Sequence, residues 1–507
     1  MWKIKRGNGI FYKTTTMDIL KNFINGSWVD SKERHTTDVI NPATQEILGK
    51  VPAGPGNRED VDRAVGAAVR AFEAWKQVPV IKRVQPLYAL KKLLEEHLDD
   101  LARTITLECG KTFAESKAEI QRAIENVEVA CGTPMLMQSE FAENVASGID
   151  EFMIRQPLGV CACIAPFNFP GMIPFWFLPY AVACGNTFIM KPSEKVPLTM
   201  QKVMDLIGRL DLPSGVINLV HGSKETVDGL LTHPDVKAIS FVGSTAVARY
   251  IYATGAANGK RVQAQGGAKN PVILLPDADI GLSARIIADS VYGCAGQRCL
   301  AASNVILVGD EKGELKEALY EAAKAKITGF GLDQGVDMGP VISRESRSRV
   351  EGLIGQAVAE GATVLLDGRD PRIKGYETGN FIKPTILENL ALDGKTINTE
   401  IFGPVMGLIP MKTLDEAIAF VNRNHYGNMA CIFTQSGLSA RTFRNQANAG
   451  NIGVNIGVAA PMAQFPFSGW NDSFFGDLHG QSRHAIEFFT QTKVVIERWP
   501  KEWSRKF

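Results

Sequence analysis

The chain has 507 residues, which is enough for roughly two or three domains with substantial hydrophobic cores. Apolar residues make up 45% and charged residues 21%, as in ordinary soluble globular proteins. The 55 basic residues balance the 54 acidic ones, and the net charge of +1 argues against a broad nucleic-acid-binding surface. We therefore expect no nucleic acid among the partners.

Two segments need care before the chain is interpreted as a globular protein. No charged residue occurs between Arg155 and Lys191, but five prolines interrupt this stretch and would break a membrane-spanning helix. We interpret it as a buried strand, a functional loop, a short apolar helix and a second buried strand. Residues 1–16 are basic but have no apolar core, so they are not a secretory signal. Either Met17 is an alternative first residue or this segment is a short organellar leader.

These features exclude a membrane from the expected partners and predict a cytoplasmic protein, or a mitochondrial matrix protein in a eukaryote. The 8 cysteines include no C-x-x-C pair and no zinc-finger spacing. We therefore expect buried thiols and no metal site.

The predicted elements begin with a hairpin, because Asn25-Gly26 is a turn signal between short apolar segments. Helical spacing follows from Asn57, and a longer amphipathic stretch covers residues 82–107. Another helix is predicted at 116–130, where Arg122 lies off the apolar stripe.

From residue 158 strands alternate with helices. Strands are predicted at 159–165, within 181–190, at 216–220 and at 236–242. This alternation is typical of a parallel sheet with helices on both faces, which binds ligands at the carboxyl ends of its strands. A second series begins near Pro271 and continues to about residue 460, so the sequence predicts an α/β fold.

Cys299 is the first candidate for chemistry. It follows Arg298 in a glycine-bearing turn, and a nearby cation favours the nucleophilic thiolate. Asn168, in a loop at a strand end, can donate an N–H to a developing oxyanion. Taken alone, each residue has a plainer interpretation, as a buried thiol or a turn residue.

A nucleotide is the second candidate ligand. Lys191 and Glu194 lie just beyond another strand and could meet hydroxyls or phosphate. The backbone N–H groups at Gly243-Ser244 open a predicted helix and suit an anion. The usual G-x-G-x-x-G fingerprint is absent, and solvated charges are the plainer interpretation of Lys191 and Glu194.

In this order and spacing, the segments resemble the aldehyde dehydrogenase superfamily from about residue 20 to 495. The resemblance rests on Pro166-Phe167-Asn168-Phe169-Pro170, Lys191-Pro192-Ser193-Glu194, Phe241-Val242-Gly243-Ser244-Thr245, Gly296-Gln297-Arg298-Cys299 and Glu400-Ile401-Phe402-Gly403-Pro404. It implies an aldehyde dehydrogenase-like α/β fold with two Rossmann-like domains and a small β extension for oligomerisation. The implied ranges are 18–137 and 158–267 for the NAD-binding domain, 268–460 for the catalytic domain, and 138–157 with 484–507 for the extension. A homodimer or homotetramer is expected.

The resemblance also implies roles for individual residues. Cys299 attacks an aldehyde carbonyl, Asn168 and the Cys299 backbone N–H form the oxyanion hole, and hydride passes to NAD. Lys191 and Glu194 bind the adenosine ribose, and Glu194 favours NAD over NADP because it repels a 2′-phosphate. The other residues expected at the cofactor are Ala165, Phe167, Lys195, Ser244, Gly266, Glu400 and Phe402.

One departure narrows the function. Hydrolytic members of the superfamily carry a water-activating Glu where this chain has Gln265, and an amide cannot accept a proton at neutral pH. The chain therefore resembles the acylating branch that uses coenzyme A and oxidises methylmalonate or malonate semialdehyde. Arg298 and Arg122 match the two arginines that bind the substrate carboxylate in that branch.

The implied products are propionyl-CoA or acetyl-CoA with loss of CO2 or bicarbonate, in valine, β-alanine or inositol breakdown. Three alternatives stay open. The first is a hydrolytic dehydrogenase, for succinate semialdehyde for example, which a carboxylate such as Asp477 could support. The second is a non-catalytic protein that retains the fold. The third is a cysteine hydrolase without NAD, although the 7 histidines lie in no local hydrolase signature.

Overall fold

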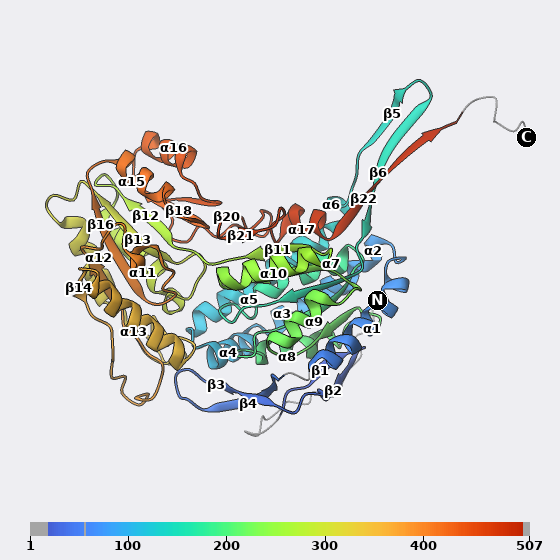
Figure 1. The fold of residues 1–507 in the computed structure, drawn as a ribbon, viewed down its shortest axis with the longest axis horizontal. Helices are drawn as coiled ribbons and strands as arrows, with labels where there is room; N and C mark the ends of the chain where they lie inside the picture. The colour runs from blue at the N-terminus through green and yellow to red at the C-terminus, as the bar shows by residue number, and fades with distance from the viewer. Residues whose placement is uncertain (1–18, 55–56, 500–507) are drawn as a thin grey trace, which may run out of the picture.

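The computed structural model describes residues 19–54 and 57–499, so the expectations for residues 1–16 and for the end of the C-terminal extension fall outside the described residues. Two largely parallel sheets form the body of the molecule, and a narrow sheet projects from it (Figure 1). The α/β fold expected from the sequence is confirmed.

The first sheet has eight strands, of which five are parallel to one another. In spatial order they are β2 (Ser27–Val29), β1 (Asn22–Ile24), β9 (Ile217–Leu219), β8 (Thr187–Lys191), β7 (Val160–Ile164), β10 (Val236–Val242), β11 (Arg261–Gln265) and β21 (Phe474–Phe475). The predicted hairpin at Asn25-Gly26 joins β1 to β2, and both turn residues have positive φ. This hairpin adds an antiparallel edge to the sheet.

The second sheet has seven strands. In spatial order they are β14 (Thr363–Leu366), β15 (Thr385–Glu388), β16 (Val405–Met411), β13 (Ala302–Val308), β12 (Asn270–Leu274), β18 (Met429–Phe433) and β19 (Asn451–Val454). All neighbours are parallel except β14 and β15. The central strands β13, β12 and β18 are almost entirely buried, which agrees with the rule that parallel sheets are covered on both faces.

Helices connect the strands of both sheets. Those before residue 260 are α1 (Arg58–Trp75), α2 (Val80–Arg83), α3 (Gln85–Glu96), α4 (Leu98–Cys109), α5 (Phe113–Cys131), α6 (Thr133–Leu136), α7 (Leu178–Ala183), α8 (Leu198–Ile207), α9 (Lys224–Thr232) and α10 (Thr245–Ala257). The later ones are α11 (Ile280–Tyr292), α12 (Glu314–Lys324), α13 (Arg344–Ala359), α14 (Lys395–Asn398), α15 (Leu414–Asn422), α16 (Gly437–Gln446) and α17 (Ser482–Phe488). Two 3₁₀ turns, η2 (Ile173–Trp176) and η3 (Gly293–Gly296), precede α7 and follow α11.

The amphipathic stretch at 82–107 is not one helix. Pro86 lies in the first turn of α3, and the chain leaves helical geometry at His97, where φ is −108°. Asp99 and Asp100 then occupy the first turn of α4, where negative charge is favourable. Pro86 and the pair Asp99 and Asp100 therefore mark the starts of two helices, although the hydrophobic pattern continues from one helix into the next.

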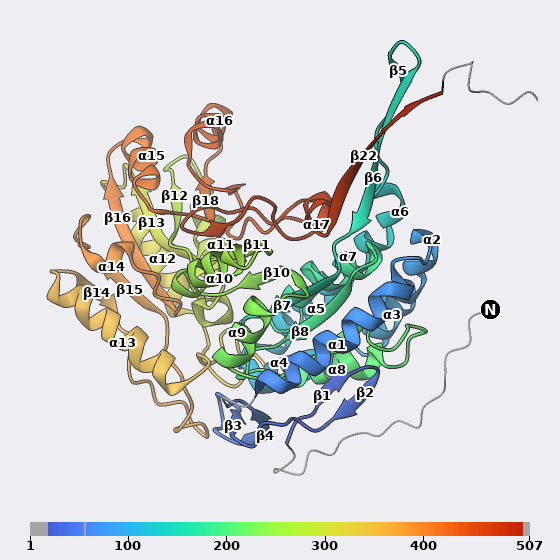
Figure 2. The same ribbon diagram turned by 45° about the vertical axis from the view of Figure 1, so that its right-hand side comes forward.

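A three-stranded sheet projects from the body in both views (Figures 1 and 2). It consists of β5 (Phe141–Ala146), β6 (Ile149–Pro157) and β22 (Thr490–Arg498), all antiparallel, with Thr490 opposite Pro157. Every residue of β5 is exposed. We call this feature the projecting sheet. Two small ribbons, β3 (Thr36–Ile40) with β4 (Ile47–Pro52) and β17 (Tyr426–Gly427) with β20 (Trp470–Asn471), complete the strands.

The uncharged segment between Arg155 and Lys191 lies in the interior, as β7, a loop, η2, α7 and β8. Within residues 19–54 and 57–499, no helix has the length and apolar character needed to cross a membrane. The 8 cysteines are free and buried.

Candidate active site

Four parallel strands bring the predicted loops to one edge of the first sheet. In the register, Ile164 at the end of β7 lies opposite Lys191 of β8 and Phe241 of β10. Val242 lies opposite Gln265, the last residue of β11. The segments that follow these strands therefore start side by side, although they are widely separated in sequence.

Lys191 and Glu194 form a pair at this edge. Lys191 is buried, and its Nζ lies 3.1 Å from Glu194 Oε2. Burial alone would raise the pKa of Glu194, but the Lys191 ammonium and hydrogen bonds to the carboxylate hold that pKa below its ordinary value. Glu194 is therefore an ionised acceptor, suited to the hydroxyls of a ribose.

The next two turns offer backbone donors. Ser244 is the N-cap residue of α10, and its hydroxyl makes no capping bond. The Gly266 N–H, in contrast, donates to the Ser473 carbonyl at 2.8 Å. The start of α10 thus has the character of an anion site, whereas the Gly266 N–H is already used within the protein.

Two aromatic rings and a cation line the loop after β7. The Ala165 N–H donates to the Lys191 carbonyl at 3.0 Å, which ties the loop to the neighbouring strand end. The rings of Phe167 and Phe402 meet edge to face with centroids 5.9 Å apart. Lys195 Nζ lies 5.7 Å from the centroid of Phe167. All five residues were expected at the cofactor.

Glu400 precedes β16 of the second sheet, and its side chain reaches the turn after β11 of the first sheet. Its Oε1 accepts the Ala268 N–H at 2.9 Å. Burial raises the pKa of Glu400 to about 6, although the charges of Arg349 and Lys269 oppose this shift. Glu400 is therefore largely ionised at neutral pH and able to accept a hydroxyl hydrogen.

The turn that carries Cys299 is strained and closely packed. Cys294 and Ala295 have φ of 51° and 54°, in the left-handed region that ordinary residues seldom adopt. Gly296 also has positive φ, and a Cβ there would lie 2.1 Å from the Gly403 carbonyl oxygen. Only glycine fits at position 296, and the turn packs directly on the Glu400-to-Pro404 segment.

Cys299 itself is buried, and its backbone is held by two side-chain amides. Its carbonyl accepts Asn270 Nδ2 at 2.8 Å and Asn428 Nδ2 at 2.9 Å. Burial raises the pKa of the Cys299 thiol to about 12, with a further rise from Glu400 and opposing hydrogen bonds from the backbone N–H groups of Leu300 and Cys299. Backbone donors are therefore available to the sulfur.

Arg298 stabilises a Cys299 thiolate less than the sequence argument expected. Its Nη2 lies 2.8 Å from Glu115 Oε1, and its Nε lies 3.2 Å from Cys294 Sγ. The guanidinium charge lowers the pKa of Cys299 less than the backbone hydrogen bonds do, because it faces Glu115 and a different cysteine. Adjacency in sequence was a poor guide to which thiol the arginine contacts.

Asn168 lies in a loop whose backbone is held by the buried side chains of Lys111 and Glu119. Its Nδ2 donates to the Gln297 carbonyl at 2.9 Å, so it contacts the turn that bears Cys299. Lys111 Nζ lies 2.6 Å from both the Asn168 carbonyl and Glu119 Oε2, and Glu119 Oε1 accepts the Gly171 N–H at 2.6 Å. A buried ion pair thus anchors both ends of the oxyanion-type loop.

Cys299, Arg298 and Arg122 line one pocket with a cavity volume of about 60 Å³. Arg122 Nη2 donates to the Pro461 carbonyl at 3.1 Å, and Nη1 lies 2.8 Å from Glu125. The structure therefore places Arg122 at the pocket and not on a free helix face. Among the described residues, no Asp or Glu lines this pocket. Asp477 interacts with Arg261 and is not among its lining residues.

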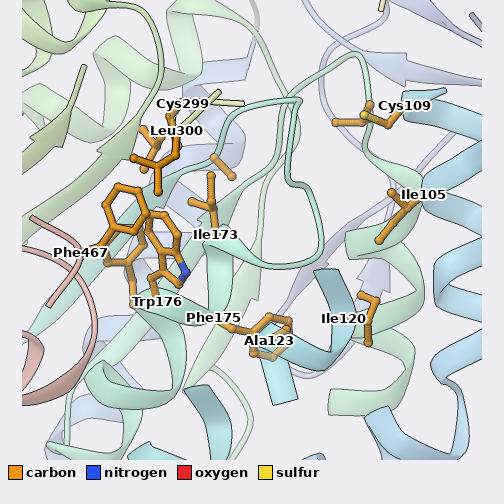
Figure 3. Close-up of a cluster of buried hydrophobic side chains, with 14 of the residues drawn as sticks. Ile105, Cys109, Ile120, Ala123, Ile173, Phe175, Trp176, Cys299, Leu300 and Phe467 are labelled. Atoms are coloured by element: carbon orange, nitrogen blue, oxygen red, sulfur yellow. The ribbon is translucent and has the colours of Figure 1, made fainter. Parts of the chain in front are cut away.

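Apart from Asn126 and Gln481, the remaining wall of the pocket is apolar. Figure 3 shows Cys299 and Leu300 close to the rings of Trp176 and Phe467, which stack with centroids 4.3 Å apart. Met172 and Phe169 continue this wall. A small ligand in this pocket would thus meet a thiol, two guanidinium groups and mostly apolar side chains.

Gln265 is linked to the Cys299 turn through Asn428, and its amide already makes hydrogen bonds within the protein. Its Nε2 donates to Asn428 Oδ1 at 3.0 Å and to the Ser468 carbonyl at 3.4 Å. An amide at this position has no basic atom to take a proton from water.

Sequence reasoning missed the residues that hold the site together. They are Lys111, Glu115, Glu119, Asn270 and Asn428. One signal was visible, because Thr112 and Glu115 have the spacing of a capping box, which the structure contains at the start of α5. Within the part of the chain that the structure describes, no group of three or more His, Cys, Asp or Glu side chains could hold a metal ion.

Comparison with known proteins shows which family the chain is similar to. The sequence profile of the Aldehyde dehydrogenase family matches residues 28–495. Malonate-semialdehyde dehydrogenase 1 of Geobacillus thermodenitrificans (strain NG80-2) is 48% identical over 487 residues, covering 96% of this chain and 100% of that protein. Malonate-semialdehyde dehydrogenase of Halalkalibacterium halodurans is 46% identical over 484 residues, covering 96% of this chain and 99% of that protein.

Two solved structures are similar over almost the whole chain. A putative methylmalonate-semialdehyde dehydrogenase from Sinorhizobium meliloti 1021, complexed with NAD, has a TM-score of 0.93 and 40% identity, covering 96% of this chain and 99% of that one. Methylmalonate-semialdehyde dehydrogenase from Oceanimonas doudoroffii has a TM-score of 0.93 and 41% identity, with the same coverage of 96% and 99%.

Proposed function

Because the chain belongs to the aldehyde dehydrogenase family, we propose that it is an NAD-dependent, coenzyme A-acylating dehydrogenase of malonate or methylmalonate semialdehyde. The observation that carries this proposal is the pocket that combines Cys299, Arg122 and Arg298 and is lined by no Asp or Glu among the described residues. A short aldehyde with a carboxylate matches one nucleophile and two guanidinium groups. The names of the relatives point to the same substrates.

The first step is addition of the Cys299 thiolate to the aldehyde carbon, which forms a C–S bond and leaves the charge on oxygen. Asn168 has a second amide N–H beyond the one donated to Gln297, and this N–H and the Cys299 backbone N–H are the donors for that oxygen. Arg122 and Arg298 hold the carboxylate at the other end of the substrate.

The edge of the first sheet fits NAD. An ionised Glu194, the uncapped hydroxyl of Ser244 and the carboxylate of Glu400 are matched to ribose hydroxyls and a pyrophosphate. Lys191, Lys195, Ala165, Phe167, Gly266 and Phe402 complete the proposed set. Bound NAD supplies the acceptor for the hydride that leaves the thiohemiacetal carbon.

The acyl group is then a thioester of Cys299. The substrate carboxylate leaves as CO2, assisted because the thioester carbonyl stabilises the resulting carbanion, and that carbanion then takes up a proton from water. The thiolate of coenzyme A attacks the remaining acyl carbon, and Cys299 leaves as a thiolate. Gln265 cannot activate water, so transfer to coenzyme A is favoured over hydrolysis.

We propose that residues 18–137 and 158–267 bind the dinucleotide, that 268–460 carry the nucleophile, and that the projecting sheet pairs subunits of a dimer or tetramer. Exposed apolar side chains on that sheet support the last point, since Phe141, Val494 and Ile496 are 65%, 59% and 65% exposed.

The test measures NADH formation from malonate semialdehyde with and without coenzyme A, with acetyl-CoA identified by mass spectrometry. We expect a single burst without coenzyme A and steady turnover with it. Equal steady rates under both conditions, with release of a free acid, would exclude the acylating mechanism. Succinate semialdehyde serves as the comparison substrate for the hydrolytic alternative.

A further inference from the structure

The backbone of the nucleophile is held by a chain of amides with a defined direction. The Ser468 carbonyl can only accept, so Gln265 must present Nε2 to it at 3.4 Å. The same Nε2 donates to Asn428 Oδ1 at 3.0 Å, which leaves Asn428 Nδ2 to donate to the Cys299 carbonyl at 2.9 Å. Every link depends on the orientation of the one before it.

The second amide on the Cys299 carbonyl is oriented independently. Asn270 Oδ1 accepts the Met429 N–H at 3.1 Å, and this backbone donor decides which way the Asn270 amide faces. The Oδ1 of Asn428 has a side chain as its partner instead, since it accepts from Gln265. The Gln265 donor therefore supports the orientation in which Asn428 offers Nδ2 to the Cys299 carbonyl, and an acceptor at position 265 would oppose it.

Holding this carbonyl has a consequence for the sulfur. The C=O of Cys299 and the N–H of Leu300 belong to one planar trans peptide and point in opposite directions. Two donors on the carbonyl therefore fix the side from which the Leu300 N–H emerges. The Leu300 N–H follows the Cys299 side chain directly in the backbone and lowers the pKa of the Cys299 thiol, which favours the thiolate.

We propose that Gln265 is a positioning residue that acts through Asn428 to hold the Cys299–Leu300 peptide with its N–H directed at the nucleophilic sulfur. This inference rests on the proposed role of Cys299 and adds to it a reason for an amide at position 265. A carboxylate there could only accept hydrogen bonds. Asn428 would turn its Nδ2 toward the carboxylate, and its Oδ1 would then face the Cys299 carbonyl, so that two oxygens repel each other.

The decisive variant is Gln265→Glu, because its side chain changes from donor to acceptor with pH. The introduced carboxyl can donate to Asn428 while it is protonated, whereas the ionised form cannot. We expect the rate of the NADH burst, divided by the wild-type rate at the same pH, to be close to one at low pH. The ratio should fall about tenfold once the introduced carboxyl ionises, as expected for the loss of one buried hydrogen bond. Recovery at low pH shows in the same sample that the variant is folded.

A second variant, Asn428→Leu, removes the donor without adding charge. We expect the pH profile for alkylation of Cys299 by iodoacetamide to shift to higher pH, with site occupancy read by peptide mass spectrometry. Asn422→Leu serves as the matched control, since the Asn422 side chain hydrogen-bonds the backbone of residues 446 and 448 near the surface.

Three outcomes would overturn the proposal. They are an unshifted alkylation profile in Asn428→Leu, a Gln265→Glu burst ratio that does not change with pH, and a coenzyme A-independent turnover of Gln265→Glu that rises with pH. The last result would show that a carboxylate at 265 acts as a base for water. Failure of the proposed function is separate, because it would appear as normal NADH formation by a Cys299→Ala protein.

Discussion

The active-site cleft and the projecting sheet are organised in opposite ways. In the cleft, the reactive groups are buried and each is held by another side chain, such as the Lys111–Glu119 pair beneath the Asn168 loop. In the projecting sheet, β5 is exposed throughout and strand pairing supplies most of its order. The residues that line the pocket around Cys299 all pack within the described chain, whereas the sheet presents apolar side chains that this chain leaves exposed. Changes in the two regions should therefore affect chemistry and assembly separately.

Replacing the nucleophile should have the largest effect. We expect Cys299→Ser to reduce NADH formation by at least about a thousandfold, since a hydroxyl is far less ionised than a thiol. Light scattering should show an unchanged assembly. A variant that still produced NADH at the native rate would remove Cys299 from the mechanism.

Breaking the buried ion pair should affect stability next. Lys111→Met leaves Glu119 without its counter-ion, which costs about 3–5 kcal/mol in a buried setting. The free energy of unfolding, measured in urea by tryptophan fluorescence, should fall accordingly, and turnover should fall with it. Lys92→Met is the control, because Lys92 pairs with Glu96 on the surface and should change stability by less than about 1 kcal/mol. Equal losses in both variants would contradict the anchoring role of Lys111.

Removing Arg122, one of the two arginines proposed to bind the substrate carboxylate, should change affinity more than rate. We expect Arg122→Met to raise the KM for malonate semialdehyde about 10- to 100-fold, the range for a charged hydrogen bond, with kcat within about threefold. The KM for propanal, which lacks a carboxylate, should stay unchanged. Arg103→Met, on an exposed face of α4, is the control. A parallel rise in both KM values would indicate a general defect of the pocket.

The titration of Glu400 should have a smaller, pH-dependent effect. Burial raises its pKa to about 6, above the ordinary value near 4.3, so the carboxylate form is lost as the pH falls through about 6. We expect the KM for NAD to rise about fivefold between about pH 7.5 and pH 5.5, on either side of that pKa. Glu400→Gln should flatten this dependence. The same change should shift alkylation of Cys299 to lower pH, because the charge of Glu400 raises the thiol pKa.

Substitutions in the projecting sheet should have the smallest effect on chemistry and a complete effect on assembly. Val494→Lys combined with Ile496→Lys places charges on its exposed apolar face. We expect a lower molar mass by light scattering, with burst amplitude per chain preserved within about twofold. Thr492→Lys is the control, since it adds charge on the same strand without removing an apolar contact. Loss of the burst would show that cleft and sheet are not independent.

Regular features of the fold followed well from the sequence. Strand ends with Gly, Pro or charged residues marked the loops at Asn168, Lys191 and Gly243, since local patterning is enough to locate them. Parallel pairing then placed these loops at a common edge. The hydrophobic period of the amphipathic stretch at 82–107 gave no sign of where one helix ends and the next begins, because it continues across the break at His97.

The supporting contacts could not be predicted in the same way. Arg298 meets Glu115 across 183 positions of sequence, and Gln265 meets Asn428 across 163. The sequence around each residue does not reveal either pairing, because each contact depends on how distant segments pack in the folded chain. For the same reason, the motif around Cys299 gave no sign that Arg298 contacts Glu115 and Cys294.

The close approach of Gly296 to the Gly403 carbonyl couples the turn that bears Cys299 to the segment 400–404. One side bears the sulfur and the other bears Glu400, so neither can shift without displacing its neighbour. Transplanting the cysteine turn into a related scaffold should therefore succeed only when the 400–404 stretch is carried over with it.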